Sequence, residues 1–175
     1  DVQAIIARVR ARLGGTADAA PLHPRIPVEL PDTSLGEGLY ATIDDAVNAA
    51  DRAYERYTAM GTGVRTAVIA SIRSAMLANA EHLAKMAHEE TGLGRPEDKV
   101  RKNILVATRT PGPEDLEPLI QTGDGGMMLT EHAPFGVIGS ITPSTNPTAT
   151  LINNTIAILS GGNAVVFNAH PAARR

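Results

Sequence analysis

The sequence predicts an α/β protein. Its first half has the spacing of amphipathic helices, and its second half changes to two short apolar, strand-like runs with one further helix between them. A strand, a helix and a strand within about 35 residues form one βαβ unit, whose strands are parallel and whose crossover is right-handed. With 43% hydrophobic and 20% charged residues, the 175-residue chain has the composition of a folded protein.

The composition also argues against several classes of function. A net charge of −3 and an aromatic content of 3% give no electrostatic or stacking basis for binding nucleic acid. No apolar run reaches the roughly 18 residues that a membrane helix needs. The five histidines are scattered and cysteine is absent, so we expect no nucleic-acid partner, no membrane span, no metal site and no disulfide.

Residues 1–13 have the pattern of a short amphipathic helix, and residues 14–34 that of a Pro/Gly-rich linker. A helix this short is marginal alone in water, so it needs a surface to pack on. A terminal helix on a semi-rigid tether is typical of a docking peptide; the alternative is an ordinary terminal helix packed on its own domain. The apolar face of the helix consists of Val2, Ile5, Ile6, Val9 and Leu13.

Three helices are expected next. Thr42 and Asp45 resemble a capping box that opens the first helix, which ends near Gly61. The second runs over residues 64–90, and the third begins at Pro96 and ends before a Pro-Gly-Pro cluster. Helical spacing turns the following residues toward the core: Ile43, Val47, Ala50, Tyr54 and Tyr57 in the first helix, Val68, Ile72, Met76, Leu83 and Met86 in the second, and Val100, Ile104 and Leu105 in the third.

The period then changes to that of strands. Residues 127–132 are a short strand candidate after a glycine-rich turn, and residues 135–142 read as a buried strand. A helix over 148–160 and a strand over 164–168 complete the βαβ unit. The helix is expected to pack through Leu151, Ile152, Thr155, Ile158 and Leu159.

Two loops follow the carboxyl ends of these strands, where open parallel sheets bind their ligands. The first, Thr142-Pro143-Ser144-Thr145-Asn146-Pro147, carries hydroxyls and a carboxamide between two prolines and opens onto a helix N-terminus. Such a stiff loop suits a cofactor phosphate or a developing oxyanion, to which the Asn146 amide could donate. The alternative is that one of its polar residues only caps the helix. No G-x-G-x-x-G is present.

The second loop is Asn168-Ala169-His170-Pro171. His170 could contact a ligand there, although a lone histidine before proline is more often a turn residue.

The stretch HAPFGVIGSITPSTNPTATLINNTIAILSGGNAVVFNAHPAA resembles the aldehyde dehydrogenase superfamily. Within it the sequence is most similar to the CoA-acylating branch of bacterial microcompartments, the propanediol- and ethanolamine-utilisation enzymes. The segments LGEGLYATIDDAVNAA, ETGLGRPEDKVRKN and TPGPEDL resemble the same branch, so the resemblance extends from about residue 35 to the end. The N-terminal helix and its tether resemble an encapsulation peptide.

The resemblance implies a Rossmann-like nucleotide-binding domain of the aldehyde dehydrogenase fold, incomplete in this chain and represented by residues 35–175, preceded by the N-terminal helical peptide. It also implies a homo-oligomer, to which residues 126–132 could contribute a pairing strand. The implied reaction converts a short-chain aldehyde, propionaldehyde or acetaldehyde, with CoA as co-substrate and NAD as cofactor, to acyl-CoA and NADH. The implied location is cytoplasmic, in the lumen of a microcompartment whose shell proteins bind residues 1–13.

The resemblance also assigns roles to the two loops. It gives Thr142, Pro143 and Ser144 contacts on the nicotinamide side, and Asn146 the stabilisation of the oxyanion. Asn168, His170 and Pro171 match the adenosine-ribose side. Hydrolytic members usually have P-W-N-F-P, with Asn in third place; here Thr145 is third and Asn146 fourth. They also often have Lys where Asn168 stands, so the choice between NAD and NADP stays open.

The nucleophile of this family is a cysteine beyond the matching region, and this chain has no cysteine. The chain begins without Met and stops directly after a strand-like run, so we expect it to be a fragment of a longer protein. Two alternatives to the acylating enzyme remain. One is a catalytically inactive fragment that acts as a docking module, and the other is a hydrolytic or phosphate-reducing relative of the same superfamily.

Deleting residues 1–13 tests the docking interpretation. We expect the deletion to abolish co-purification with microcompartment shell proteins and to leave any affinity for the cofactor unchanged, because the helix is tethered apart from the predicted nucleotide site. Pull-down with shell proteins and NAD titration measure the two properties. Retention of shell binding by the deletion variant would contradict a targeting role.

Overall fold

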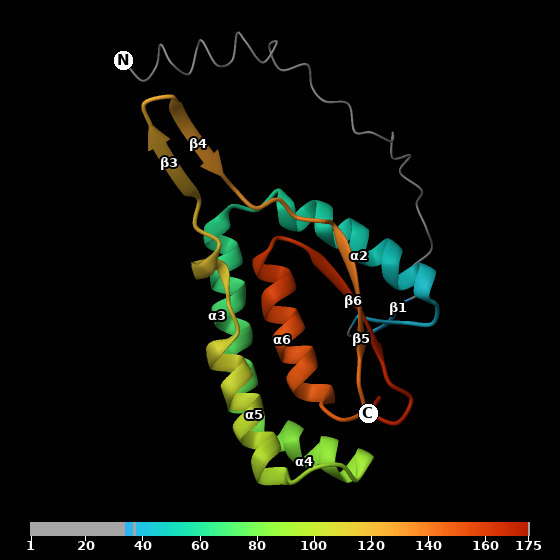
Figure 1. Ribbon diagram of the computed structural model, residues 1–175. Coiled ribbons are helices and arrows are strands. Elements are labelled where there is room, and N and C mark those ends of the chain that lie inside the picture. Colours follow the sequence, from blue (N-terminus) through green and yellow to red (C-terminus); the bar gives the residue numbers. More distant parts are fainter. Residues whose placement is uncertain (1–33, 37, 175) are drawn as a thin grey trace. The chain divides into compact units, whose positions relative to one another are not determined.

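The computed structural model describes residues 34–36 and 38–174 (Figure 1). The predicted helix over 1–13 and nearly all of the predicted linker lie outside these residues, so both stay predictions. The elements in chain order are β1 (Ser34–Gly36), β2 (Leu39–Tyr40), α2 (Ile43–Thr58), α3 (Thr62–Ala78), α4 (Ala80–Thr91), α5 (Pro96–Arg109), the 3-10 turn η1 (Pro113–Asp115), β3 (Leu119–Gly123), β4 (Gly126–Thr130), β5 (Val137–Thr142), α6 (Pro147–Ser160) and β6 (Ala164–Ala169).

The predicted βαβ unit is present and forms the centre of the described fold. Strands β5 and β6 pair in parallel, from Val137 opposite Ala164 to Thr142 opposite Ala169, and α6 connects them. The buried Asn163 holds the starts of the two strands together, because its Oδ1 accepts hydrogen bonds from Phe135 N (2.6 Å) and Gly136 N (3.0 Å). The shared register places the carboxyl ends of the two strands side by side.

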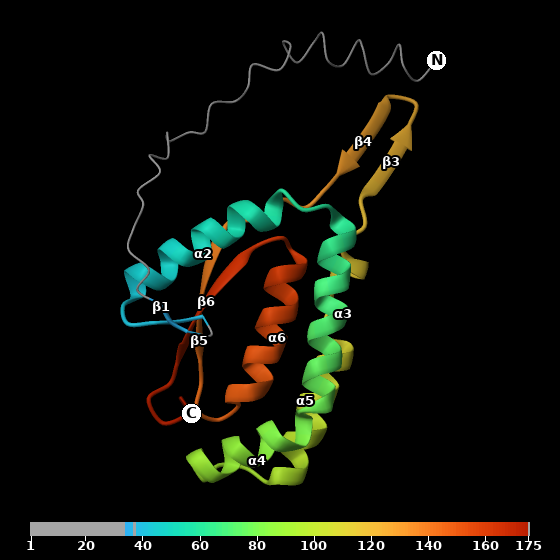
Figure 2. The same cartoon turned by 180° about the vertical axis from the view of Figure 1, so that it is seen from behind.

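Helices cover both faces of this strand pair (Figures 1 and 2). Asn154 of α6 donates from Nδ2 to Ser140 Oγ at 3.0 Å, so α6 lies on the face to which Ser140 points. Helix α2 lies against the other face, near Val137, Gly139 and Ile141. Helices α3 and α5 pack on α6 from outside, and α4 contacts α5.

The hydrophobic core lies between α3, α5 and α6. Its fully buried members are Ile69, Ala107, Ile152 and Ile156, and Ile72, Met76, Val106 and Leu159 pack around them. Ile72 and Met76 therefore face the core as predicted. The small side chain of Ala107 lets α5 approach closely, and the isoleucines supply most of the apolar contact in this cluster.

A buried amide ties three of the helices together. Asn103 of α5 is 1% exposed, and its Nδ2 donates to the Ala80 carbonyl at the start of α4 (3.1 Å). Its Oδ1 accepts from Thr148 Oγ1 in the first turn of α6 (2.9 Å). A buried amide is tolerated only when both ends are satisfied, as they are here. The amino end of α6 is thus held against α5.

The helix predicted over 64–90 is two helices, α3 and α4, separated at Asn79. The backbone of Asn79 leaves the helical region, with φ −106° and ψ 6°, and its side chain donates to the Ala75 carbonyl at 2.9 Å. No Gly or Pro marks the break. Because Asn competes with the backbone for local hydrogen bonds, it ends a helix without such a marker.

The predicted cap of α2 is half confirmed. Thr42 Oγ1 accepts from Asp45 N at 3.2 Å, as an N-cap does. The Asp45 carboxylate accepts from the Thr42 hydroxyl at 2.7 Å. In a capping box it would instead accept from the backbone N–H of Thr42.

Several predicted core faces are wrong. On α5, Ile104 and Leu105 are exposed, whereas Lys99, Asn103 and Ala107 are buried at spacings of four. On α6, Leu151 is exposed while Ile152 and Ile156 are buried. On α2 no described residue is fully buried, and Ile43 and Val47 are exposed. On α5 the buried face carries small and polar residues that contact α4 and α6, whereas a rule based on hydrophobicity alone selects the larger side chains.

The strand predicted over 127–132 is β4, which ends earlier, at Thr130. It pairs antiparallel with β3, from Leu119 opposite Thr130 to Gly123 opposite Gly126, and β3 was not predicted. The two residues between the strands, Asp124 and Gly125, are a typical hairpin turn and would have indicated it. The strand predicted as buried, β5, leaves Ile141 82% exposed. None of the described helices is long and apolar enough to cross a membrane.

Two neighbouring residues on α6 provide a test of the core. We expect Ile152→Ala to lower the free energy of unfolding by about 2–5 kcal/mol, since it deletes buried methyl groups and leaves a cavity. Leu151→Ala is the matched control and should lower it by less than about 1 kcal/mol, because Leu151 is already 41% exposed. Urea unfolding followed by circular dichroism measures both, and equal losses would contradict this core.

Candidate cofactor and active site

The two predicted site loops lie beside each other. Each follows the carboxyl end of one parallel strand, the first after Thr142 of β5 and the second after Ala169 of β6, and these two residues are directly paired. Figures 1 and 2 show both loops at the same end of the strand pair, next to the start of α6. Because ligands of open parallel sheets bind at this end of the strands, the fold places the predicted residues where a site can form.

The first loop has a polar surface on a fixed backbone. Thr142 is buried beneath it, Pro143 is exposed, and Ser144 and Asn146 are half-buried. Pro147 is the first helical residue of α6, as predicted, since its ring fixes the backbone angle that a helix start needs. The loop therefore presents a hydroxyl and a carboxamide at the surface, directly before the free N–H groups of a helix.

Asn146 occupies the N-cap position of α6, but its side chain does not cap the helix. The Asn146 backbone carbonyl accepts from Thr150 N at 3.0 Å, while Oδ1 accepts from Lys102 Nζ at 2.5 Å. The alternative that this residue serves only as a helix cap is therefore not supported. Its carboxamide is held from outside the loop, by a residue of α5.

A second lysine of α5 reaches the same loop. Lys99 is only 6% exposed, and its Nζ donates to the Thr145 carbonyl at 3.1 Å. Burial lowers the pKa of the Lys99 amine from its ordinary value of 10.5, and the positive charge of Lys102 lowers it further. Gly94 makes room for this side chain: a Cβ there would lie 3.2 Å from Lys99 Cε, and the φ of +71° suits glycine.

These two lysines were missed in the sequence. A lysine in a helix normally extends into solvent, so neither its type nor its spacing indicates a loop contact. The signal that could have identified Lys99 is indirect and lies in its spacing from two buried residues of α5. Lys99 lies four residues before Asn103 and eight before Ala107, the stripe that packs on α6.

The second loop is a turn. His170 Nδ1 accepts from Ala172 N at 3.1 Å, and the His170 carbonyl accepts from Ala173 N at 2.8 Å. These bonds support the turn interpretation of His170. Pro171 and Asn168 are exposed, so the loop still offers a surface beside the first one.

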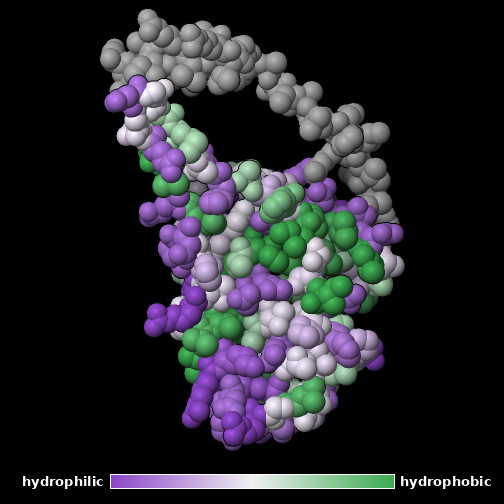
Figure 3. Space-filling view, in the orientation of Figure 1, coloured by the Kyte–Doolittle hydropathy of each residue, from purple (hydrophilic) through white to green (hydrophobic). Residues whose placement is uncertain are grey.

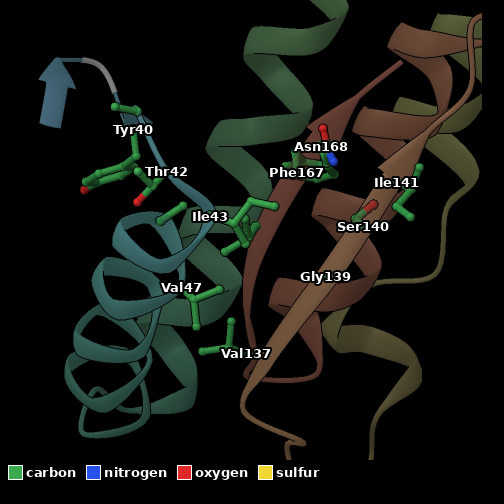
Figure 4. Close-up of a pocket in the computed structure, with 13 residues that line it drawn as sticks. Tyr40, Thr42, Ile43, Val47, Val137, Gly139, Ser140, Ile141, Phe167 and Asn168 are labelled. Carbon is green, nitrogen blue, oxygen red and sulfur yellow. The ribbon is translucent and has the colours of Figure 1, made fainter. Parts of the chain in front are cut away.

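A cavity of about 380 Å³ lies between α2 and the strand pair (Figure 4). Its wall is mostly apolar, and Asn168 is the one sequence-predicted site residue among those that line it. The other residues of the two loops lie outside this cavity. Figure 3 shows hydrophobic side chains gathered over α2 and the neighbouring strands. The labelled residues of the wall are Tyr40, Thr42, Ile43, Val47, Val137, Gly139, Ser140, Ile141, Phe167 and Asn168.

Within the described part of the chain, no group of three or more His, Cys, Asp or Glu residues is placed to hold a metal ion. The polar groups that the fold does bring together are hydroxyls, carboxamides and two ammonium groups. Such a set recognises polar and anionic organic groups through hydrogen bonds.

Comparison with known proteins assigns this arrangement to a family. Residues 33–174 match the model of the aldehyde dehydrogenase family. The chain belongs to the aldehyde dehydrogenase family. It is 52% identical over 138 residues to an acetaldehyde dehydrogenase (acetylating) of Bilophila wadsworthia, a match that covers 79% of this chain and 28% of that protein.

Solved aldehyde dehydrogenase structures resemble it as well. A propionaldehyde dehydrogenase of Rhodopseudomonas palustris with bound propionyl-CoA is 45% identical, with a TM-score of 0.76 over 79% of this chain and 31% of that one. A propionaldehyde dehydrogenase from the fucose utilisation bacterial microcompartment of Clostridium phytofermentans is 48% identical, with a TM-score of 0.74 over 78% and 31%. The predicted fold class is confirmed, and the chain spans about three tenths of the length of these relatives.

The pKa of Lys99 can be measured by NMR titration of the lysine side chains. We expect its pKa to lie below 10.5 in the folded protein and to rise in Lys102→Gln, but not fully, since burial is the larger cause and remains. Because this pKa is lower in the folded chain, the unfolded chain binds more protons at pH values between the folded and unfolded pKa. The free energy of unfolding therefore increases as the pH rises through that range. An ordinary pKa for Lys99, or none of this response to Lys102→Gln, would contradict the geometry.

Proposed function

We propose that the chain is the N-terminal portion of an NAD-dependent, CoA-acylating aldehyde dehydrogenase. The observation that carries the proposal is the 52% identity to an acetylating acetaldehyde dehydrogenase over about four fifths of the chain. The reaction is aldehyde, CoA and NAD⁺ to acyl-CoA, NADH and a proton. The names of the relatives favour propionaldehyde or acetaldehyde as substrate and favour CoA over water as acyl acceptor.

The donor set at the carboxyl ends of β5 and β6 fits a nicotinamide dinucleotide. Pro143 and Ser144 would contact its nicotinamide side, with the buried Thr142 supporting them from below. Asn168, His170 and Pro171 would contact its adenosine-ribose side. When bound, NAD supplies the acceptor for the hydride. The support for this assignment is that the parallel register brings both groups of residues to one end of the strand pair.

Asn146 is the candidate catalytic residue in this chain. Attack on an aldehyde carbonyl places negative charge on its oxygen, and an amide N–H aimed at that oxygen stabilises the charge. With Oδ1 bonded to Lys102, the Nδ2 group has no hydrogen-bond partner among the described residues, so it is available as a donor. This availability supports the role, because an amide already used for capping or packing could not serve.

The nucleophile must come from residues outside this chain. The resemblance implies a cysteine thiolate, and the 175 residues contain no cysteine. The proposed division of labour is that this chain holds the cofactor and stabilises the oxyanion, and the rest of the protein supplies the attacking thiolate and the acyl pocket.

The proposed setting is the lumen of a bacterial microcompartment in the cytoplasm, with shell proteins bound by residues 1–13. The microcompartment named for the Clostridium phytofermentans relative supports this setting. A homo-oligomer is proposed through the β3–β4 hairpin. Its support is that the hairpin exposes apolar side chains on both of its faces, as surfaces covered by a partner do. They are Leu119, Ile120, Met127, Met128 and Leu129, each more than half exposed.

Turnover tests the proposed function. We expect NADH formation from propionaldehyde or acetaldehyde by the full-length protein only when CoA is present, and none by the 175-residue chain alone, because it lacks a thiolate. In the full-length protein Asn146→Ala should lower kcat by about 10²–10³-fold, the usual loss for one oxyanion donor. Thr108→Ala, an exposed change on α5, is the control and should have no effect. Turnover by the short chain, or CoA-independent acid formation by the long one, would contradict the proposal.

A further inference from the structure

The amide of Asn146 is oriented by its partner on α5. An ammonium group has donors and no acceptor, so only the oxygen of the carboxamide can face Lys102 Nζ. The oxygen and nitrogen of an amide are similar in size, but only the oxygen can accept from Lys102. The 2.5 Å contact to Oδ1 therefore fixes the orientation of the amide. The nitrogen then lies on the other side of the amide, away from the ammonium group.

The same contact changes the strength of the amide as a donor. A hydrogen bond from a charged donor is stronger than one between neutral groups, and it withdraws electron density from the amide oxygen. Hydrogen bonds in series polarise one another, so the opposite N–H becomes a better donor.

Lys99 holds the backbone on which this amide stands. Its Nζ donates to the carbonyl of Thr145, the residue directly before Asn146, from a nearly fully buried position. Burial of an ammonium group is unfavourable unless it is hydrogen-bonded, so the contact to the loop offsets part of that penalty. Lys99 and Lys102 thus reach the loop from one helix, one at the main chain and one at the side chain.

We propose that Lys102 is a positioning residue for the proposed reaction: it turns the Asn146 carboxamide so that an Nδ2–H is presented to the aldehyde oxygen, while Lys99 fixes the loop backbone beneath. This inference rests on the proposed function, because it assigns a role to Lys102 only if Asn146 acts on an oxyanion. It differs from a stability role, since Lys102 is exposed and its loss leaves no cavity.

A double-mutant cycle in the full-length protein tests the inference. Lys102→Met removes the ammonium group and keeps the length of the side chain, and we expect kcat to fall about tenfold with KM for NAD and CoA unchanged. Asn146→Ala should cost about 10²–10³-fold. Because Lys102 acts through Asn146, the double variant should be no slower than Asn146→Ala alone. Lys102→Arg keeps a charged donor and should recover most of the activity.

The matched control is Arg101→Met, which removes the adjacent exposed cation of the same helix. Arg101 lies near Asp98, at 3.8 Å, and within the described part of the chain no contact between it and the loop is observed. We expect kcat to stay at the wild-type value in this variant. An equal loss in Arg101→Met and Lys102→Met would mean that net charge, and not the contact to Asn146, is responsible, and would overturn the inference.

A second readout uses the full-length protein, labelled with ¹⁵N at asparagine, and needs no turnover. The side-chain amide resonances of Asn146 should shift in Lys102→Met and stay in place in Arg101→Met, because only the first change removes the bond to Oδ1. An unmoved amide overturns the orientation itself. Wild-type full-length protein without CoA-dependent oxidation would overturn the proposed function instead, and losses that multiply in the double variant would overturn the positioning role alone.

Discussion

The parallel pairing of β5 and β6 is the constraint on which the candidate site depends. Parallel strands cannot be joined by a short turn, so the chain between them must cross back to the start of the sheet, and here it does so as a helix. That helix, α6, begins after the short loop 143–146 that follows β5, and it returns the chain so that β6 ends beside β5. Both loops, the helix N-terminus and Asn146 are therefore brought together by connectivity, before any side-chain contact is considered.

Packing on the other side of α6 then fixes how the loop is presented. Ala107 and Asn103 let α5 approach α6 closely, and Asn103 bonds to Thr148 in the first turn. The same closeness brings Lys99 and Lys102 within reach of Thr145 and Asn146. The small and polar residues of the α5–α6 contact therefore have two effects. They support the helix crossover, and they bring charged donors of α5 to the loop before α6.

Much of the fold follows from local rules. The change from helical to strand period located β5, α6 and β6, and the proline at the start of α6 was placed correctly because its ring suits the first helical turn. The buried faces of the helices and the break between α3 and α4 did not follow from these local rules. Asn79 ends α3 through a side-chain bond that leaves no Gly or Pro signal, and the buried face of α5 is set by a neighbour far along the chain. The site residues came from strand ends and from the family resemblance, and their roles stay predictions. Lys99 and Lys102 could not be identified from the sequence, because they contact the loop only once α5 is packed beside it.

The outer edges of β5 and β6 are unpaired in the part of the chain that the structure describes. Among the described residues β5 and β6 pair only with each other, and Ile141 projects from β5 almost fully exposed. Unpaired backbone groups along a strand are templates for another strand, and an apolar neighbour strengthens the attraction. In isolation this chain would therefore be prone to aggregate through intermolecular strand addition. A soluble preparation of it would need low concentration, or a charged residue such as lysine introduced at Ile141, to keep the molecules apart.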